Sequence, residues 1–321
     1  MAISSFLGSS ALLPAGLGFR NKIINGGFDV WQRSTSATVT GADSYSTADR
    51  WRIRTAGAGG SVTSSRQSAG LNGYQYCLRY QRVSGNTDTN ALQLVQTLET
   101  SESIKLVGGS VVLSFWARSG ANYSPTSSAL KVYLTSGTGT DQYWLSFTNY
   151  ANVIDQTATL TTTWQRFVYI ATPSTSATQF SVQFQMTPTG TAGANDYFEI
   201  TGVQLEANYQ ATPFEQRPIG VELQLCQRYY CYMNFDTGTG ANFVDGYQSY
   251  GAYITSWLQF PQTMRTRPTT VTIGIGGYSN TTGWTANGVS PDYCQVYATM
   301  SVSGVNRGYY YINNVYASAE L

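Results

Sequence analysis

Apolar and polar side chains alternate along many short stretches of this chain. One face of the stretch 111–119 carries Val111, Leu113, Phe115 and Ala117. One face of the stretch 180–186 carries Phe180, Val182, Phe184 and Met186. Glycine, serine, threonine and asparagine separate such stretches, and a period of two over many short segments is typical of antiparallel sheets. The pattern therefore predicts an all-β fold, a sandwich or a barrel.

Residues 218–233 break this pattern. Pro218 can open a helix at its first turn. The apolar positions that follow it, at spacings of three, four and three, are Leu223, Cys226, Tyr230 and Met233. A strand is the alternative, because Leu223, Leu225 and Tyr229 alternate with polar residues. We predict a short helix here.

Two prolines in "ATPFEQRPIG", residues 211–220, mark a boundary just before this helix. Strand-like stretches resume after it, and they indicate a second, smaller β domain from residue 218 to residue 321. Within that domain, "YSNTTGWTANGVS" at 278–290 has the composition of an exposed loop.

Composition narrows the possible functions. Charged residues make up 11% of the 321-residue chain and aromatic residues 14%, with 24 Tyr, which favours ordered β structure over disorder. The net charge of +1 and the lack of a long basic run argue against nucleic acid and an anionic membrane surface as partners. Membrane insertion is not expected either. The chain has no histidine, so Ser-His-Asp triads and imidazole metal ligands are excluded.

The four cysteines, too few to form a disulfide scaffold, are predicted to be free, buried thiols. Cys226 and Cys231 lie five residues apart and would point in different directions on a helix or on a strand. A Cys-x4-Cys pair without histidine is also a poor metal site. We therefore expect no metal and no cofactor.

The first 19 residues carry no charge. A signal peptide would need a basic region before the apolar run, and Pro14 with several glycines and serines makes a membrane span improbable. The segment is either a weakly ordered terminus or an arm that orders on a partner. The apolar residues that such an arm could bury are Ile3, Phe6, Leu7, Leu12, Leu13, Leu17 and Phe19.

Several longer segments, in a fixed order, resemble a known group of proteins. They are "NKIINGGFDVWQRS" at 21–34, "STADRWRI" at 46–53, "VVLSFWAR" at 111–118, "TTTWQRFVYI" at 161–170 and "FEITGVQLEANYQATPFEQRPIGVELQLCQRYY" at 198–230. The chain from about residue 20 onward resembles tailed-phage fibre-like virion proteins, whose first domain is a jelly-roll similar to carbohydrate-binding modules.

This resemblance implies a bacteriophage virion structural protein, a non-enzymatic tail fibre that forms a homotrimer. It implies an anchoring arm at 1–20, a jelly-roll β-sandwich at 21–217 and a C-terminal β domain at 218–321 that forms the trimer or tip. The arm would dock on a tail adaptor or nozzle protein or on the capsid. The exposed part would bind host cell-surface polysaccharide, on a particle assembled in the host cytoplasm.

Two alternatives to this function stay open. One is a capsid decoration or head fibre with a purely structural role, and the other is a polysaccharide-degrading tailspike. The chain has 17 acidic residues, but no spacing singles out a catalytic pair. Related jelly-rolls often hold a structural calcium through adjacent aspartates on their last strand. Thr201 and Gly202 stand there instead, which argues against the ion.

Candidate glycan contacts are aromatic and polar side chains on the face of a strand opposite the core. Trp116 and Arg118 share that face, and Gln183 and Gln185 occupy the corresponding face of another strand. The alternative is that a loop or a neighbouring subunit covers Trp116 and that Arg118 pairs with a carboxylate.

A second candidate contact is Tyr278 with Trp284 in the expected distal loop. The other aromatic residues of this domain are Trp257, Tyr293, Tyr309, Tyr310 and Tyr311. A trimer interface or a β core is the alternative role for all of these residues.

The remaining marked positions have structural interpretations. Trp31, Trp51 and Trp164 lie near predicted strand starts and are expected to anchor the core or its edge. Arg33, Asp49 and Arg50 offer both charge signs within a weakly charged chain, so we expect an ion-pair network there.

Overall fold

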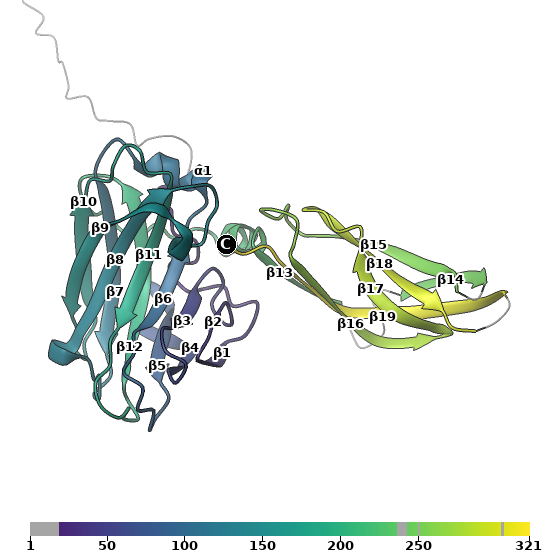
Figure 1. The fold of residues 1–321 in the computed structure, drawn as a ribbon, viewed down its shortest axis with the longest axis horizontal. Coiled ribbons are helices and arrows are strands. Elements are labelled where there is room, and N and C mark those ends of the chain that lie inside the picture. Colours follow the sequence, from purple (N-terminus) through teal and green to yellow (C-terminus); the bar gives the residue numbers. More distant parts are fainter. Residues whose placement is uncertain (1–18, 236–242, 250, 303–304) are drawn as a thin grey trace, which may run out of the picture.

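The computed structural model describes residues 19–235, 243–249, 251–302 and 305–321. It contains a broad β-sandwich and a smaller, elongated β unit, and the chain end at Leu321 lies between them (Figure 1). Helices are few and short, and the all-β prediction is confirmed. The helical elements are α1 (Thr100–Ser103), η1 (Ile104–Leu106), η2 (Thr126–Ser128), η3 (Trp144–Ser146) and α2 (Ile219–Gln227).

Two six-stranded antiparallel sheets form the sandwich, a jelly-roll-like architecture. Sheet A consists, in spatial order, of β1 (Ser36–Thr40), β4 (Ser61–Leu71), β5 (Tyr74–Arg82), β12 (Tyr197–Ala207), β7 (Val111–Ser119) and β10 (Gln165–Ala171). Sheet B consists of β2 (Asp43–Ser44), β3 (Arg52–Thr55), β6 (Leu92–Thr97), β11 (Gln179–Met186), β8 (Ala129–Thr138) and β9 (Thr148–Thr159).

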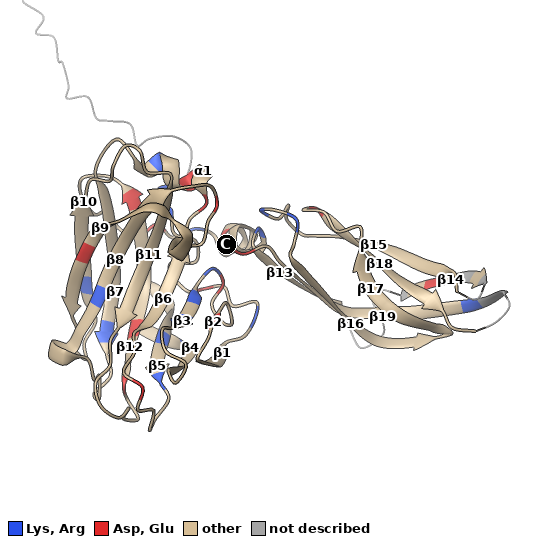
Figure 2. Cartoon of the chain, viewed as in Figure 1, with Lys and Arg blue, Asp and Glu red and all other residues tan. Residues whose placement is uncertain are grey.

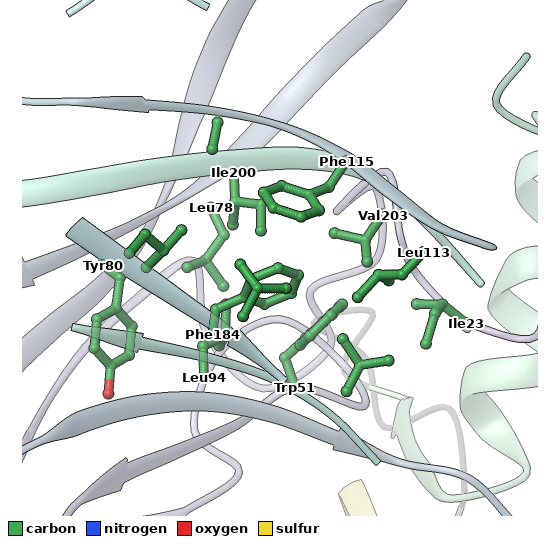
Figure 3. Close-up of a cluster of buried hydrophobic side chains, with 14 of the residues drawn as sticks. Ile23, Trp51, Leu78, Tyr80, Leu94, Leu113, Phe115, Phe184, Ile200 and Val203 are labelled. Carbon is green, nitrogen blue, oxygen red and sulfur yellow. The ribbon is translucent and has the colours of Figure 1, made fainter. Parts of the chain in front are cut away.

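Aliphatic side chains and aromatic rings together fill the space between these two sheets (Figure 3). Trp51 is fully buried, its ring lies 5.1 Å from that of Phe28, and its indole N–H donates to the carbonyl of Asn25 at 3.0 Å. Phe115 of sheet A meets Phe184 of sheet B edge-on at 4.8 Å. The inward faces predicted from the alternation in 111–119 and 180–186 are thus confirmed. Truncating such a ring typically costs about 3–5 kcal/mol.

The other two tryptophans marked in the sequence lie at the margin of this core. Trp31 is partly buried against the core. Trp164 lies outside it and donates its indole N–H to the carbonyl of Ala69 at 2.9 Å.

The second unit packs a four-stranded sheet against a three-stranded sheet. Sheet C has β19 (Val305–Ser318) between β16 (Thr270–Ser279) on one side and, on the other, β13 (Tyr230–Asn234) and β14 (Phe243–Ser249). Sheet D has the order β15 (Tyr253–Gln259), β18 (Tyr293–Met300) and β17 (Thr281–Asn287). Their shared core includes Ile254, Val296, Tyr310 and Ile312.

Two sequence predictions need correction. The helix α2 ends at Gln227, and Tyr230 and Met233 lie in β13, because residues 230–234 pair with residues 314–318 of β19. Cys226 of the predicted apolar stripe is buried, whereas Leu223 is only partly so. The stretch 278–290 is largely strand rather than loop, because Thr281–Asn287 pairs with β18.

The four cysteines are free and buried, as predicted. Burial raises the pKa of the Cys231 thiol to about 12 and that of Cys294 to about 11. Among the residues described, no cluster of three histidine, cysteine or acidic side chains is placed to hold a metal. The described helices include none with the length and apolarity needed to cross a bilayer.

A network of arginines, carboxylates and tyrosines joins the two units. Arg50 is fully buried, and its guanidinium pairs with Glu320, donates to the carbonyl of Thr97 at 2.7 Å and lies 3.5 Å from the centre of the Tyr229 ring. Arg33 donates to Glu320 at 3.0 Å and lies 3.7 Å from the centre of the Tyr230 ring. We call Arg33, Arg50, Tyr229, Tyr230 and Glu320 the junction cluster.

Further polar contacts surround the junction cluster. They are Arg228 with Glu99 at 3.0 Å, Arg265 with Asp141 at 3.3 Å, the Tyr45 hydroxyl with the carbonyl of Leu321 at 3.0 Å, and the Gln32 amide with the carbonyl of Tyr230 at 2.8 Å. The expected network of Arg33, Asp49 and Arg50 therefore forms only in part: Asp49 pairs with Arg33 at 3.5 Å, whereas Arg50 pairs with Glu320.

The buried carboxylate of Asp49 is expected to stabilise the folded protein at the junction. Its side chain is 1% exposed and accepts hydrogen bonds from the Gln32 amide at 2.6 Å and the Gln32 backbone N–H at 3.3 Å. We expect Asp49→Ala to lower the melting temperature at neutral pH, because it leaves buried donors unpaired at a cost of about 1–3 kcal/mol. Asp155→Ala, at an exposed ion pair, is the control and should have almost no effect.

The same carboxyl predicts a pH dependence. Burial raises the pKa of Asp49 from 3.8 to about 6, so the folded state binds its proton more tightly than the unfolded state does. The penalty for burying the charge is complete above about pH 6 and disappears as the pH falls to about 4. In urea unfolding, the free energy of unfolding of wild type should therefore rise relative to that of Asp49→Asn as the pH falls from about 6 to about 4. Parallel profiles for the two proteins would contradict the assignment.

Candidate functional site

The four residues expected to form one glycan patch lie on opposite sides of the sandwich. Trp116 and Arg118 are on the outer face of sheet A, and Gln183 and Gln185 are on the outer face of sheet B. Gln183 is buried and donates to Thr135 Oγ1 at 3.2 Å, and the Tyr150 hydroxyl lies beside it. Gln185 donates to Thr187 at 3.2 Å and accepts from Gln93 at 2.9 Å. The two pairs therefore cannot act as one site.

On sheet A, the strand register brings two arginines to one buried carboxylate. Glu199 of β12 lies opposite Arg79 of β5 on one side and opposite Arg118 of β7 on the other. Arg79 donates through Nε at 2.9 Å and Nη2 at 2.6 Å to Glu199 Oε1, and Arg118 donates through Nε at 2.6 Å to Oε2. Glu199 is 0% exposed, while the arginines are 27% and 30% exposed. The carboxylate thus fixes both guanidinium groups against the sheet.

Each of these guanidinium groups also lies against an aromatic ring. Arg79 is 4.1 Å from the centre of the Tyr197 ring, and Arg118 is 4.7 Å from that of Trp164. The Nη atoms of Arg118 have no hydrogen-bond acceptor among the described residues, so they can donate to a ligand. We call Tyr197, Arg79, Glu199, Arg118 and Trp164 the Glu199 cluster. It combines flat rings with fixed cationic donors and a net charge of +1 from two arginines and one glutamate.

The turn between β4 and β5 covers Trp116 beside this cluster. The Tyr74 hydroxyl lies beside the Trp116 indole, and the Tyr74 ring packs 5.5 Å from that of Phe214. This approach needs a glycine in β12: a Cβ on Gly202 would come within 2.7 Å of the Tyr74 ring. Gly202 lies at a bulge in β12 and has φ of +63°. The departure at Gly202 that argued against calcium in the sequence therefore has a packing cause.

A cleft of about 490 Å³ opens at the end of the sandwich near Tyr74, Phe214 and α2. The carboxylates of Glu215 and Glu222 line it but already have partners. Glu215 accepts the backbone N–H groups of Arg20 and Asn21 at 3.0 Å each, and Glu222 pairs with Arg217 at 3.2 Å. Glu215 thus joins the segment between β12 and α2 to residues 20–21, and Glu222 joins it to α2. We assign both carboxylates a structural role.

The other predicted contacts lie far along the chain from the Glu199 cluster. The ring centres of Tyr278 and Trp284 are 4.4 Å apart, with Tyr278 59% exposed and Trp284 packed partly against the core of the second unit. Of the predicted arm residues, Phe19 is exposed, and the Arg217 guanidinium lies 4.8 Å from its ring centre. Ile3, Phe6, Leu7, Leu12, Leu13 and Leu17 lie outside the described residues.

Sequence reasoning missed three members of the Glu199 cluster, namely Arg79, Tyr197 and Glu199. The alternation along 198–205 places Glu199 opposite the core residues Phe198 and Ile200 and could have marked it as outward-facing. The strand order was not available from that alternation, so nothing in the sequence joined Glu199 to Arg118 or to Arg79.

Comparison with known proteins gave structural matches only. No family model matches the chain, and no curated protein matches it. A solved structure titled "CBM4 structure and function" has 21% identity and a TM-score of 0.36, covering 57% of this chain and 97% of that one. The galactotriose complex of TmCBM61 has 14% identity and a TM-score of 0.32, covering 58% and 98%. The enzymatically active domain of a bacteriophage CBA120 tailspike has 13% identity and a TM-score of 0.37, covering 58% of this chain but 21% of that one.

The role of Gly202 can be tested with a double-mutant cycle. Gly202→Ala should lower the melting temperature more than Gly190→Ala, because both glycines have φ near +60° but only the Cβ at 202 meets a neighbour within 3 Å. The shared cost of a left-handed alanine is about 1–2 kcal/mol. The additional cost should vanish when Gly202→Ala is combined with Tyr74→Ala. Equal losses at the two glycines would show that Tyr74 imposes no constraint.

Proposed function

We propose that this chain is a non-enzymatic structural protein of a tailed-phage particle, a homotrimeric tail fibre that binds glycans on the host surface. The Glu199 cluster is the observation that carries the glycan-binding part. It presents guanidinium donors and aromatic rings on a sheet face, and both arginines keep about a quarter or more of their side-chain surface exposed, at 27% and 30%. The rings of Trp164 and Tyr197 are partly exposed, and aromatic rings beside fixed donors are typical of binding surfaces.

The chemistry of the cluster indicates an acidic sugar. Arg79 and Arg118 together carry two positive charges and Glu199 one negative charge, so the cluster attracts a carboxylate. The unoccupied Nη groups of Arg118 can bind a sugar carboxylate in a charge-assisted manner, which is stronger than a neutral hydrogen bond. The rings of Trp164 and Tyr197 offer apolar faces on either side for the C–H groups of neighbouring sugar units.

The assignment to a phage particle rests on sequence resemblance. The run from "FEITGVQLE" through "ATPFEQRP" to "CQRYY" covers most of β12, the linker and α2. In the linker and α2, Arg217 forms ion pairs with Glu215 and Glu222. Under the proposal, residues 1–20 dock the fibre on a tail or capsid protein, and the rest of the chain extends outward to the host.

Binding should depend on Arg118. We expect Arg118→Ala to weaken binding to sialylated or uronate-containing oligosaccharides by about tenfold or more on a glycan array, because a desolvated guanidinium contact is lost. Lys131→Ala is the matched control, since it removes one positive charge from the outer face of sheet B and should leave binding unchanged.

Two outcomes would contradict the proposal. If wild type binds no host envelope glycan, a purely structural decoration or head fibre becomes the better assignment. If the protein releases new reducing ends from host polysaccharide, it is a degrading tailspike instead.

The docking role of the N-terminal residues has a separate test. A chain starting at residue 21 should remain a soluble, folded oligomer by sedimentation and circular dichroism, because the described core of the sandwich begins at Ile23. It should fail to assemble onto particles in a complementation assay read by electron microscopy. Normal incorporation of this truncated chain would refute the arm.

A further inference from the structure

The outer face of sheet D, formed by β15, β17 and β18, carries no charged side chain. Inward and outward positions alternate along β15 and β18: Ile254 and Leu258 of β15 and Val296 and Ala298 of β18 point into the core. The outward positions carry Tyr253, Thr255, Trp257, Gln259, Thr282, Thr285, Asn287, Tyr293, Gln295, Tyr297 and Thr299. No outward position is charged or aliphatic. Figure 2 shows β15, β17 and β18 without charged residues, in contrast to the sandwich and the junction.

The aromatic rings of this face form two pairs. Trp257 and Tyr293 meet edge-to-face with ring centres 5.1 Å apart, and Tyr253 and Tyr297 meet the same way at 4.9 Å. In each pair the partners are diagonal neighbours on β15 and β18. Tyr253 and Trp257 are four residues apart on one strand, which corresponds to about 13 Å.

Hydroxyl and amide groups lie between the two ring pairs. Thr255 is opposite Tyr297, and Gln295 is opposite Trp257, so both lie on the sheet surface between the pairs. Thr285 and Asn287 extend this polar floor onto β17. These groups can donate and accept hydrogen bonds but cannot neutralise a charge.

The rings are open to solvent. Trp257 is 61% exposed and Tyr253 is 58% exposed. Large exposed aromatic surface in a folded protein marks an interaction site. Protein–protein interfaces are enriched in methionine and arginine as well as in aromatic residues, and the outward positions of sheet D have neither.

We propose that the outer face of sheet D is a second glycan site, which binds a neutral polysaccharide. The two ring pairs stack on the apolar faces of sugar units, and Thr255, Gln295 and Asn287 bind the hydroxyl groups between them. A charged sugar would lose solvation on this face without gaining an ionic partner, so the site discriminates against acidic glycans. The inference adds a ligand class to the proposed function and does not use the Glu199 cluster.

The test separates the two sites on one array of neutral glucose-, galactose- and mannose-based oligosaccharides together with sialylated and uronate-containing ones. Trp257→Ala should lose binding to neutral oligosaccharides by about tenfold or more and retain acidic binding, whereas Arg118→Ala should do the reverse. Tyr209→Ala is the matched control, because Tyr209 is a 74% exposed ring remote in sequence from sheet D and should change neither. Circular dichroism melts should confirm that Trp257→Ala folds, as expected for an exposed side chain.

Each other result overturns one proposal or both. If wild type binds acidic but not neutral oligosaccharides, the sheet D site is wrong and the proposed function stands. If neutral binding survives in a Tyr253→Ala, Trp257→Ala double variant, the ligand binds elsewhere and the sheet D site is also wrong. If Trp257→Ala instead changes the sedimentation coefficient and leaves glycan binding intact, the face is an interface between copies. No binding by wild type to either class overturns both proposals.

Discussion

The buried guanidinium of Arg50 is the constraint on which the arrangement of this chain depends. A cation with 1% exposed side-chain surface must find fixed partners, because burial removes its hydration. Its partners come from three distant segments: Thr97 at the end of β6, Tyr229 after α2 and Glu320 after β19. Burial would lower the pKa of Arg50, but Glu320, Tyr229 and Tyr45 raise it above its ordinary value. Its backbone adopts a φ of +71°, which an arginine rarely tolerates without such support.

The Glu199 cluster contains the same kinds of side chain as the junction cluster, but its arginines are more exposed to solvent. In both places a carboxylate bridges two arginines and each guanidinium lies against an aromatic ring. At the junction Arg50 has no surface left for a ligand, so the contacts contribute to holding the two units. On sheet A the arginines remain partly exposed, and the same chemistry can act on a ligand. Sheet D shows the opposite case, a face on which recognition would depend on rings, hydroxyls and amides alone.

Local alternation predicted the inward residues well because a strand in a sandwich has one buried face whatever its neighbours are. Leu113, Phe115, Val182 and Phe184 followed from it directly. The same pattern failed for Gln183 and Trp116, because facing away from the core is not the same as being exposed. Thr135 and Tyr150 cover Gln183, and Tyr74 covers Trp116. The helix prediction failed beyond Gln227 because pairing with β19, more than 80 residues away, decided the state of 230–234.

The sequence by itself determined the β class, the position of a short helix near Pro218, the free state of the four cysteines and the predicted inward residues of β7 and β11. These features follow from local periodicity and composition, which do not depend on which distant segments pair with one another. Only the tertiary structure decided that Arg79, Glu199 and Arg118 meet, that Glu320 closes the junction, and that four rings of sheet D share one uncharged face. Those features depend on strand order and register, and pairing between distant segments fixes both.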